Sequence, residues 1–117
     1  MPTDNKNVFE KAPPAPVIAA LARYFHRNGY VRRQNARRLS REGYSRYKKG
    51  DEVRLTAQSP EELARIRRLL ELAGFTPGQP FLKARQYRQP VYGREAVRRF
   101  LGLVEAERIA ESGSRGD

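Results

Sequence analysis

Apolar residues recur with a helical period in three stretches of the chain. The first follows Pro16, a residue suited to the first turn of a helix, and is expected to end at Gly29 as its C-cap. The second begins at Ser59-Pro60-Glu61-Glu62, which combines a capping serine with a proline and a glutamate, and ends at Gly74. The third follows Gly93, and its apolar positions have i, i+3, i+4, i+7 spacing: Val97, Phe100, Leu101 and Val104.

Two other stretches favour strands. Val53, Leu55 and Ala57 alternate with polar residues, which is the period of a half-buried strand. Residues 81–92 alternate aromatic and basic side chains, which predicts two short strands, and Pro90 is expected to confine the second of them to a sheet edge. A short strand is also predicted at residues 30–33, whereas residues 34–41 are compatible with a helical turn or a loop.

The predicted order is αββαββα, and such an order implies an α+β domain of two layers. We expect a mostly antiparallel sheet with the helices on one face and the other face free. The proline-rich residues 1–15 predict a flexible arm, residues 16–105 a single domain, and residues 106–117 the helix end and a disordered tail from about Ser112.

Charge is unevenly distributed along this pattern. The chain has 117 residues and a net charge of +11, and residues 30–49 hold eight Lys or Arg against Glu42, a local charge of +7. Residues 79–99 carry a further +5, so a fold that brings the two segments to one face would create a continuous positive surface. Tyrosines are interleaved with the first cluster, and cations with flat rings suit phosphates and bases.

Composition excludes several kinds of site. The chain has no cysteine, and therefore no disulfide or thiolate metal site, which fits a reducing cytoplasm. No apolar run is long enough to span a membrane, and the first residues do not resemble a signal peptide. Asp51 and Glu52 are adjacent on a predicted strand and would point to opposite faces, so no metal site is expected, and no partner for catalysis is visible near His26.

These observations predict a small, non-enzymatic, cytoplasmic nucleic-acid-binding domain without cofactor, metal or small-molecule substrate, with DNA favoured over RNA. The predicted contact residues are cations of the two basic segments and of the strand between them: Arg32, Arg33, Arg37, Arg38, Arg46, Lys48, Lys49, Arg54, Lys83, Arg85 and Arg88. The predicted stacking residues are Tyr30, Tyr44, Tyr47 and Tyr87. Oligomeric state and sequence specificity are not readable from the pattern.

The order of elements, with an apolar helix ending at Gly29, resembles one LAGLIDADG homing-endonuclease unit, whose sheet forms a saddle over DNA. Aligned on that glycine, the motif positions run from Leu21 to Gly29 and match at Leu21, Ala22, Gly29 and two apolar positions. Arg23 replaces a small residue of the motif and Asn28 replaces its metal-binding acid. An amide cannot supply the anionic ligand that a divalent metal requires, so the resemblance implies a DNA-binding sheet without cleavage.

Other functions remain open at this stage. Basic composition with exposed tyrosines also suits an RNA-binding or ribosome-associated protein. A metal-dependent nuclease is the alternative from a different class, and an adaptor that binds a partner through the apolar stripe of the first helix, with Ile18, Tyr24 and Phe25, is another. The simplest alternative is a basic surface that serves only solubility.

Overall fold

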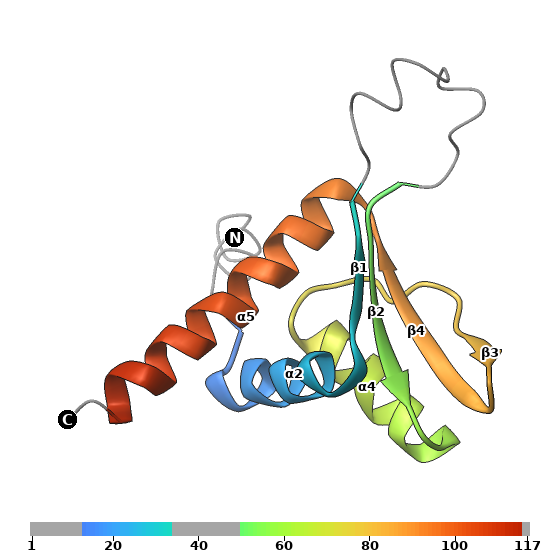
Figure 1. The fold of residues 1–117 in the computed structure, drawn as a ribbon, viewed down its shortest axis with the longest axis horizontal. Coiled ribbons are helices and arrows are strands. Elements are labelled where there is room, and N and C mark those ends of the chain that lie inside the picture. The colour runs from blue at the N-terminus through green and yellow to red at the C-terminus, as the bar shows by residue number, and fades with distance from the viewer. Residues whose placement is uncertain (1–12, 34–49, 116–117) are drawn as a thin grey trace, which may run out of the picture.

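The computed structural model describes residues 13–33 and 50–115 of the chain, and the elements keep the labels of Figure 1. They follow in the order α2 (Ala15–Asn28), β1 (Tyr30–Arg32), β2 (Glu52–Ala57), α4 (Pro60–Leu72), β3 (Phe81–Lys83), β4 (Gln86–Tyr92) and α5 (Arg94–Arg115). The strands form one sheet in the order β1-β2-β4-β3, and every neighbouring pair is antiparallel. The predicted α+β class and the order αββαββα are confirmed.

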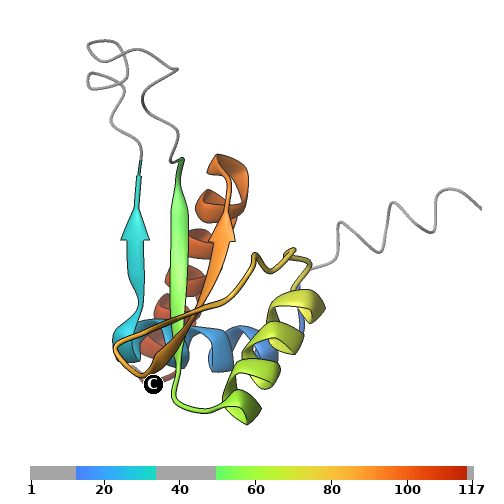
Figure 2. The same cartoon turned by 90° about the vertical axis from the view of Figure 1, so that its right-hand side faces the viewer.

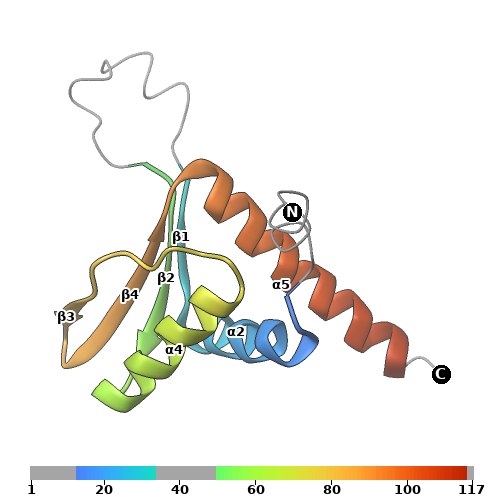
Figure 3. The same cartoon turned by 180° about the vertical axis from the view of Figure 1, so that it is seen from behind.

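The fold has two layers. The three helices lie on one side of the sheet, and Figure 2 looks onto the side that they leave uncovered (Figures 1 and 2). Seen from behind, α5 extends away from the sheet past α2 (Figure 3). Val53, Leu55 and Ala57 of β2 point into the helix layer and are fully buried there, as the alternation of the sequence predicts. Phe100 of α5 completes this core with edge-to-face contacts to two other phenylalanines, Phe25 and Phe75.

The predicted start of α4 is confirmed in detail. The hydroxyl oxygen of Ser59 accepts a hydrogen bond from the backbone N–H of Glu62 at 3.1 Å, and Pro60 occupies the first turn. At the other end Gly74 has a φ of +91°, a left-handed conformation that favours glycine after a helix.

Gly29 is the C-cap of α2, as predicted. Its φ of −75° and ψ of 162° are extended rather than left-handed. A Cβ atom at this position would lie 2.3 Å from the carbonyl oxygen of Phe25. Glycine is required here because the chain turns closely against the helix before it enters β1.

The prediction that Pro90 confines its strand to the sheet edge is wrong, because β4 lies between β2 and β3. The short length of β3 explains the difference. The pairing between β3 and β4 stops at Phe81 and Arg88, two residues before Pro90. Beyond that pair the carbonyl oxygen of Pro90 accepts a hydrogen bond from Gly78 N–H at 2.8 Å. In a strand, the N and the C=O of one residue point to the same side. The N of Pro90 therefore points away from β2, and the lack of an N–H removes no hydrogen bond between β4 and β2.

The last helix is longer than predicted. It continues to Arg115, beyond Ser112, where a disordered tail was expected. No helix within residues 13–33 and 50–115 combines the length and the apolar character needed to cross a membrane.

Candidate nucleic-acid interface

The pairing of the strands places one set of alternating side chains on the face of the sheet opposite the helices. We call this the outer face. Within the described strands its residues are Tyr30 and Arg32 of β1, Glu52, Arg54 and Thr56 of β2, Phe81 and Lys83 of β3, and Gln86, Arg88, Pro90 and Tyr92 of β4. Four of the predicted contact residues therefore share one face, with one cation from each strand: Arg32, Arg54, Lys83 and Arg88.

Two other predicted contacts lie outside this face. Arg33 follows β1 and lines a shallow pocket of about 300 Å³ with Asp51 and, from α5, Arg94 and Arg98. Arg85 is exposed in the two-residue turn between β3 and β4, at the end of the sheet. Arg33 therefore belongs to a different surface. Arg85 extends the outer face at the end formed by the β3–β4 hairpin, which we call its hairpin end.

Glu52 is an acid on the outer face, and it is almost fully buried, with an exposed fraction of 1%. Its carboxylate lies 2.6 Å from Nη2 of Arg32 and 2.6 Å from Nε of Arg54. Arg32 also donates to the carbonyl oxygen of Gly50 at 3.2 Å. Two arginines share one buried carboxylate, so this end of the outer face is a closed ion-paired cluster with a formal charge of +1.

Aromatic rings extend the cluster across the sheet. The guanidinium carbon of Arg54 lies 5.0 Å from the ring centre of Tyr30 and 5.2 Å from that of Phe81, which come from opposite edges of the sheet. The hydrogen bond to Glu52 raises the pKa of Arg54 above its ordinary value, and Arg54 therefore stays charged at all physiological pH values. Tyr30 and Tyr92 remain 45% and 53% exposed, so rings of this face are accessible to a partner.

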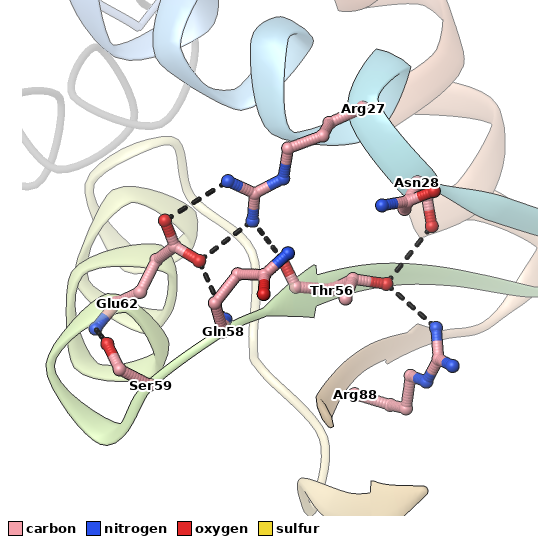
Figure 4. Close-up of polar contacts among 7 residues, drawn as sticks. All are labelled: Arg27, Asn28, Thr56, Gln58, Ser59, Glu62 and Arg88. Carbon is pink, nitrogen blue, oxygen red and sulfur yellow. Dashed lines mark hydrogen bonds and ion pairs between the residues drawn. The ribbon is translucent and has the colours of Figure 1, made fainter. Parts of the chain in front are cut away.

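Thr56 connects the outer face to the helix layer (Figure 4). Its hydroxyl donates to the backbone carbonyl oxygen of Asn28 at 3.1 Å and accepts a hydrogen bond from Nη1 of Arg88 at 2.9 Å. Its own carbonyl oxygen accepts from Nη2 of Arg27 at 2.8 Å. Asn28, which occupies the motif-acid position of the LAGLIDADG resemblance, thus contributes its main chain to this network.

Glu62 anchors the opposite side of the same network. Arg27 binds its carboxylate with both terminal nitrogens, at 2.7 and 3.2 Å, and the backbone N–H of Gln58 donates to it at 2.7 Å. The hydrogen bond from Arg27 lowers the pKa of Glu62, and the same bond raises the pKa of Arg27. This acid therefore neutralises a helix cation, and in Figure 4 it lies on the far side of Thr56 from Arg88.

Arg88 uses little of its hydrogen-bonding capacity within the described residues. Its Nε atom is buried and has no hydrogen-bond partner, and its contact to Thr56 is with a neutral hydroxyl. No ion pair joins Arg88, Lys83 or Arg85 to an acid within the described residues. The hairpin end of the outer face is therefore positive without compensation in this part of the chain.

The turn of this hairpin is unusual in its residues. Ala84 and Arg85 have φ values of +51° and +67°, as a two-residue turn between antiparallel strands of this type requires. Asparagine and glycine adopt this conformation readily, whereas Ala and Arg do so at a cost of about 1 kcal/mol each.

The remaining predicted site residues fall into two groups. Tyr87 pairs with Ala57 and packs against the core on the helix side, so it does not contribute a ring to the outer face. The others lie outside the described residues: Arg37, Arg38, Tyr44, Arg46, Tyr47, Lys48 and Lys49. His26 is exposed with its ring centre 5.6 Å from that of Phe25, and among the described side chains no three metal-ligating residues are grouped.

Sequence reasoning missed the outer-face role of Glu52, Thr56, Phe81 and Tyr92. The Glu52–Arg54 pair carried a usable signal, because strand residues two apart lie on the same face and an acid there can pair with an arginine. The exposure of Tyr92 and the position of the Phe81 ring beside Arg54 depend on how the strands pair, so the local sequence gives no signal for them.

The chain matches no protein-family model, no curated protein and no solved structure. The resemblance to a LAGLIDADG unit therefore stays a prediction.

Proposed function

We propose that this chain is a non-enzymatic nucleic-acid-binding domain that holds duplex DNA against the outer face of its sheet. The observation that carries the proposal is the charge of that face. In the described part of the chain, the face and its hairpin turn present five cations against one acid, Glu52, together with two exposed tyrosines. The five cations are Arg32, Arg54, Lys83, Arg85 and Arg88.

The helix layer offers a contrast that argues against a surface kept basic only for solubility. Several of its arginines are paired with acids on the same layer: Arg27 with Glu62, Arg98 with Glu95 and Arg108 with Glu105. Three helix arginines are thus offset by acids, whereas Lys83, Arg85 and Arg88 of the sheet have no ion pair within the described residues. A polyanion gains most from a face where neutralising its phosphates releases counterions and displaces no internal ion pair.

Duplex DNA is the first candidate because of the shape of the hairpin. The major groove is about 12 Å wide and admits a two-stranded antiparallel ribbon. The β3–β4 hairpin forms the edge of the sheet, with β4 also paired to β2, and it carries Lys83, Arg85 and Arg88. Arginine can bind a guanine edge or a phosphate with two parallel hydrogen bonds, so the same side chains suit both kinds of contact.

The salt dependence of DNA binding tests the proposal. Engagement of three to five phosphates, from Lys83, Arg85 and Arg88 alone to all five cations, corresponds to a log–log slope between about −2.7 and −4.5, at about −0.9 per phosphate. Fluorescence anisotropy with a labelled duplex of about 20 base pairs, measured across a salt series, gives this slope directly. A slope flatter than about −2, or no binding at low salt, contradicts the proposal.

RNA is the second candidate, and the exposure of Tyr30 and Tyr92 on the outer face favours it. Unpaired bases stack on such rings, whereas a duplex offers stacked bases only at its ends. Competition of the bound duplex with single-stranded RNA of equal length separates the two, because the preferred ligand displaces the label at lower concentration.

The absence of catalysis is also part of the proposal, since Asn28 offers no carboxylate where the LAGLIDADG motif has its acid. Incubation of supercoiled plasmid with the pure protein and Mg²⁺ should leave the plasmid intact. Cleavage that disappears in Asp51→Ala would instead establish a metal-dependent nuclease.

A further inference from the structure

We infer that the β3–β4 hairpin is a phosphate-binding site, in which Lys83, Arg85 and Arg88 hold phosphodiester groups of the nucleic-acid backbone. We call these three residues the hairpin site. The inference rests on the proposed function and deepens it, because it assigns the phosphate contacts to one end of the outer face.

Paired and unpaired cations are separated along the outer face. Arg32 and Arg54 lie 2.6 Å from the buried carboxylate of Glu52, and Arg54 is also enclosed between two rings. A phosphate that recruited these arginines would have to compete with a buried carboxylate, and an acid left buried without its partners is costly. The cations of the hairpin site have no such partner in the described structure, so phosphates bind there without that cost.

Arg88 has N–H donors that no hydrogen bond of the described residues uses. A guanidinium has five N–H donors, and Arg88 uses one of its terminal nitrogens for the hydroxyl of Thr56. Its Nε is removed from water and has no acceptor, an arrangement that costs about 1–3 kcal/mol and is rare in folded proteins. The bond to Thr56 fixes the guanidinium. Because Nε is buried, the donors left for a phosphate oxygen are the remaining N–H groups of the terminal nitrogens.

The turn of the hairpin has a strained backbone conformation. Ala84 and Arg85 both hold left-handed backbone conformations, with φ of +51° and +67°, that glycine or asparagine would adopt at less cost. Backbone strain of this kind is concentrated at functional sites. Here it places the exposed side chain of Arg85 at the tip of the ribbon.

The pairing of the strands brings the members of the site together. Lys83 is paired with Gln86, so it is the diagonal neighbour of Arg88 on the same face, at about 7–8 Å between the backbones. Arg85 lies within the two-residue turn next to this pair. Three cations on one short ribbon can therefore contact neighbouring phosphates of one strand.

A first experiment tests the site without any nucleic acid. The Nε–Hε resonance of Arg88 and the Nζ resonance of Lys83 are followed by NMR while inorganic phosphate is added, with sodium chloride at equal ionic strength as the reference. Saturable shifts at these two resonances, absent at the helix residue Arg98, are expected. Shifts no larger than those caused by chloride, or equal shifts at all arginines, overturn the phosphate site.

A second experiment compares two triple variants with the same loss of charge. Lys83→Gln/Arg85→Gln/Arg88→Gln removes the hairpin site, whereas Arg23→Gln/Arg65→Gln/Arg68→Gln removes three exposed cations of α2 and α4. The hairpin variant should make the salt slope of duplex binding less steep by about 2.7 and the helix variant should leave it unchanged. Circular dichroism and thermal melting confirm that both variants are folded.

The outcomes distinguish the inference from the proposed function. Duplex binding that weakens equally in both triple variants, or that is unchanged in the hairpin variant, overturns the hairpin site while the domain still binds nucleic acid. Saturable phosphate shifts without duplex binding support the site and contradict the proposed function. If the protein binds vesicles with phosphatidylglycerol and not the duplex, the phosphodiester comes from lipid, and the assignment to nucleic acid is wrong.

Discussion

Replacing Arg54 with alanine should destabilise the domain strongly, although Arg54 lies on the outer face. The substitution removes a 2.6 Å charge-assisted hydrogen bond to Glu52, worth about 1.5–3 kcal/mol, and two contacts with aromatic rings, worth about 0.5–1 kcal/mol each at partly exposed sites. Arg32 still pairs with the carboxylate, so the full penalty of an unpaired buried charge, about 3–5 kcal/mol, is not reached. We expect a loss of about 3 kcal/mol in the free energy of unfolding.

Urea denaturation followed by circular dichroism measures this loss through the midpoint at constant slope. Arg98→Ala is the matched control, because Arg98 also pairs with a glutamate, Glu95, but both side chains are exposed. Such a pair contributes about 0–1 kcal/mol. In a Glu52→Gln background the cost of Arg54→Ala should fall by at least about 1 kcal/mol, which isolates the interaction between the two charges.

Equal losses for Arg54→Ala and Arg98→Ala would refute the reasoning. Glu52 would then not depend on Arg54, and the arginines of the β1–β2 end of the outer face would be as available to phosphates as those of the hairpin site. An unchanged cost in the Glu52→Gln background would show that ring contacts, rather than the ion pair, hold Arg54.

Three further predictions concern other parts of the fold. Because Arg27 lowers the pKa of Glu62 below 4.5, this carboxylate stabilises the native state above about pH 4.5, and the stabilisation is lost as pH falls through the lowered value. The difference in unfolding free energy between wild type and Glu62→Gln should therefore be constant near neutral pH and shrink on acidification, and a difference independent of pH would contradict it. Ser59→Ala should cost about 1 kcal/mol in urea denaturation, since it removes the N-cap of α4, and no measurable loss would show that the cap is dispensable. Ala84→Asn should raise stability by about 0.5–1 kcal/mol by relieving the left-handed turn while Arg85 stays in place, and a lower melting temperature would argue against the turn geometry.

Much of the fold could be read from local sequence. Each predicted helix exists, because a 3.6-residue apolar period, a capping serine and terminal glycines act within a few residues of one another. The alternation of Val53, Leu55 and Ala57 correctly predicted which side of β2 enters the core. The position of Pro90 was mispredicted, since whether a proline interrupts a sheet depends on where the neighbouring strand stops.

The candidate site likewise has features that local sequence shows and features that only strand pairing decides. The sequence by itself determined that cations are concentrated in the strands and their connections, because composition and spacing are local properties. It could not show that Arg32 and Arg54 share the carboxylate of Glu52 while Arg88 has an unused donor. These differences arise from strand pairing and burial. Strand pairing joins residues twenty or more positions apart, and the free energy of each charge then depends on which residues lie beside it in the neighbouring strands.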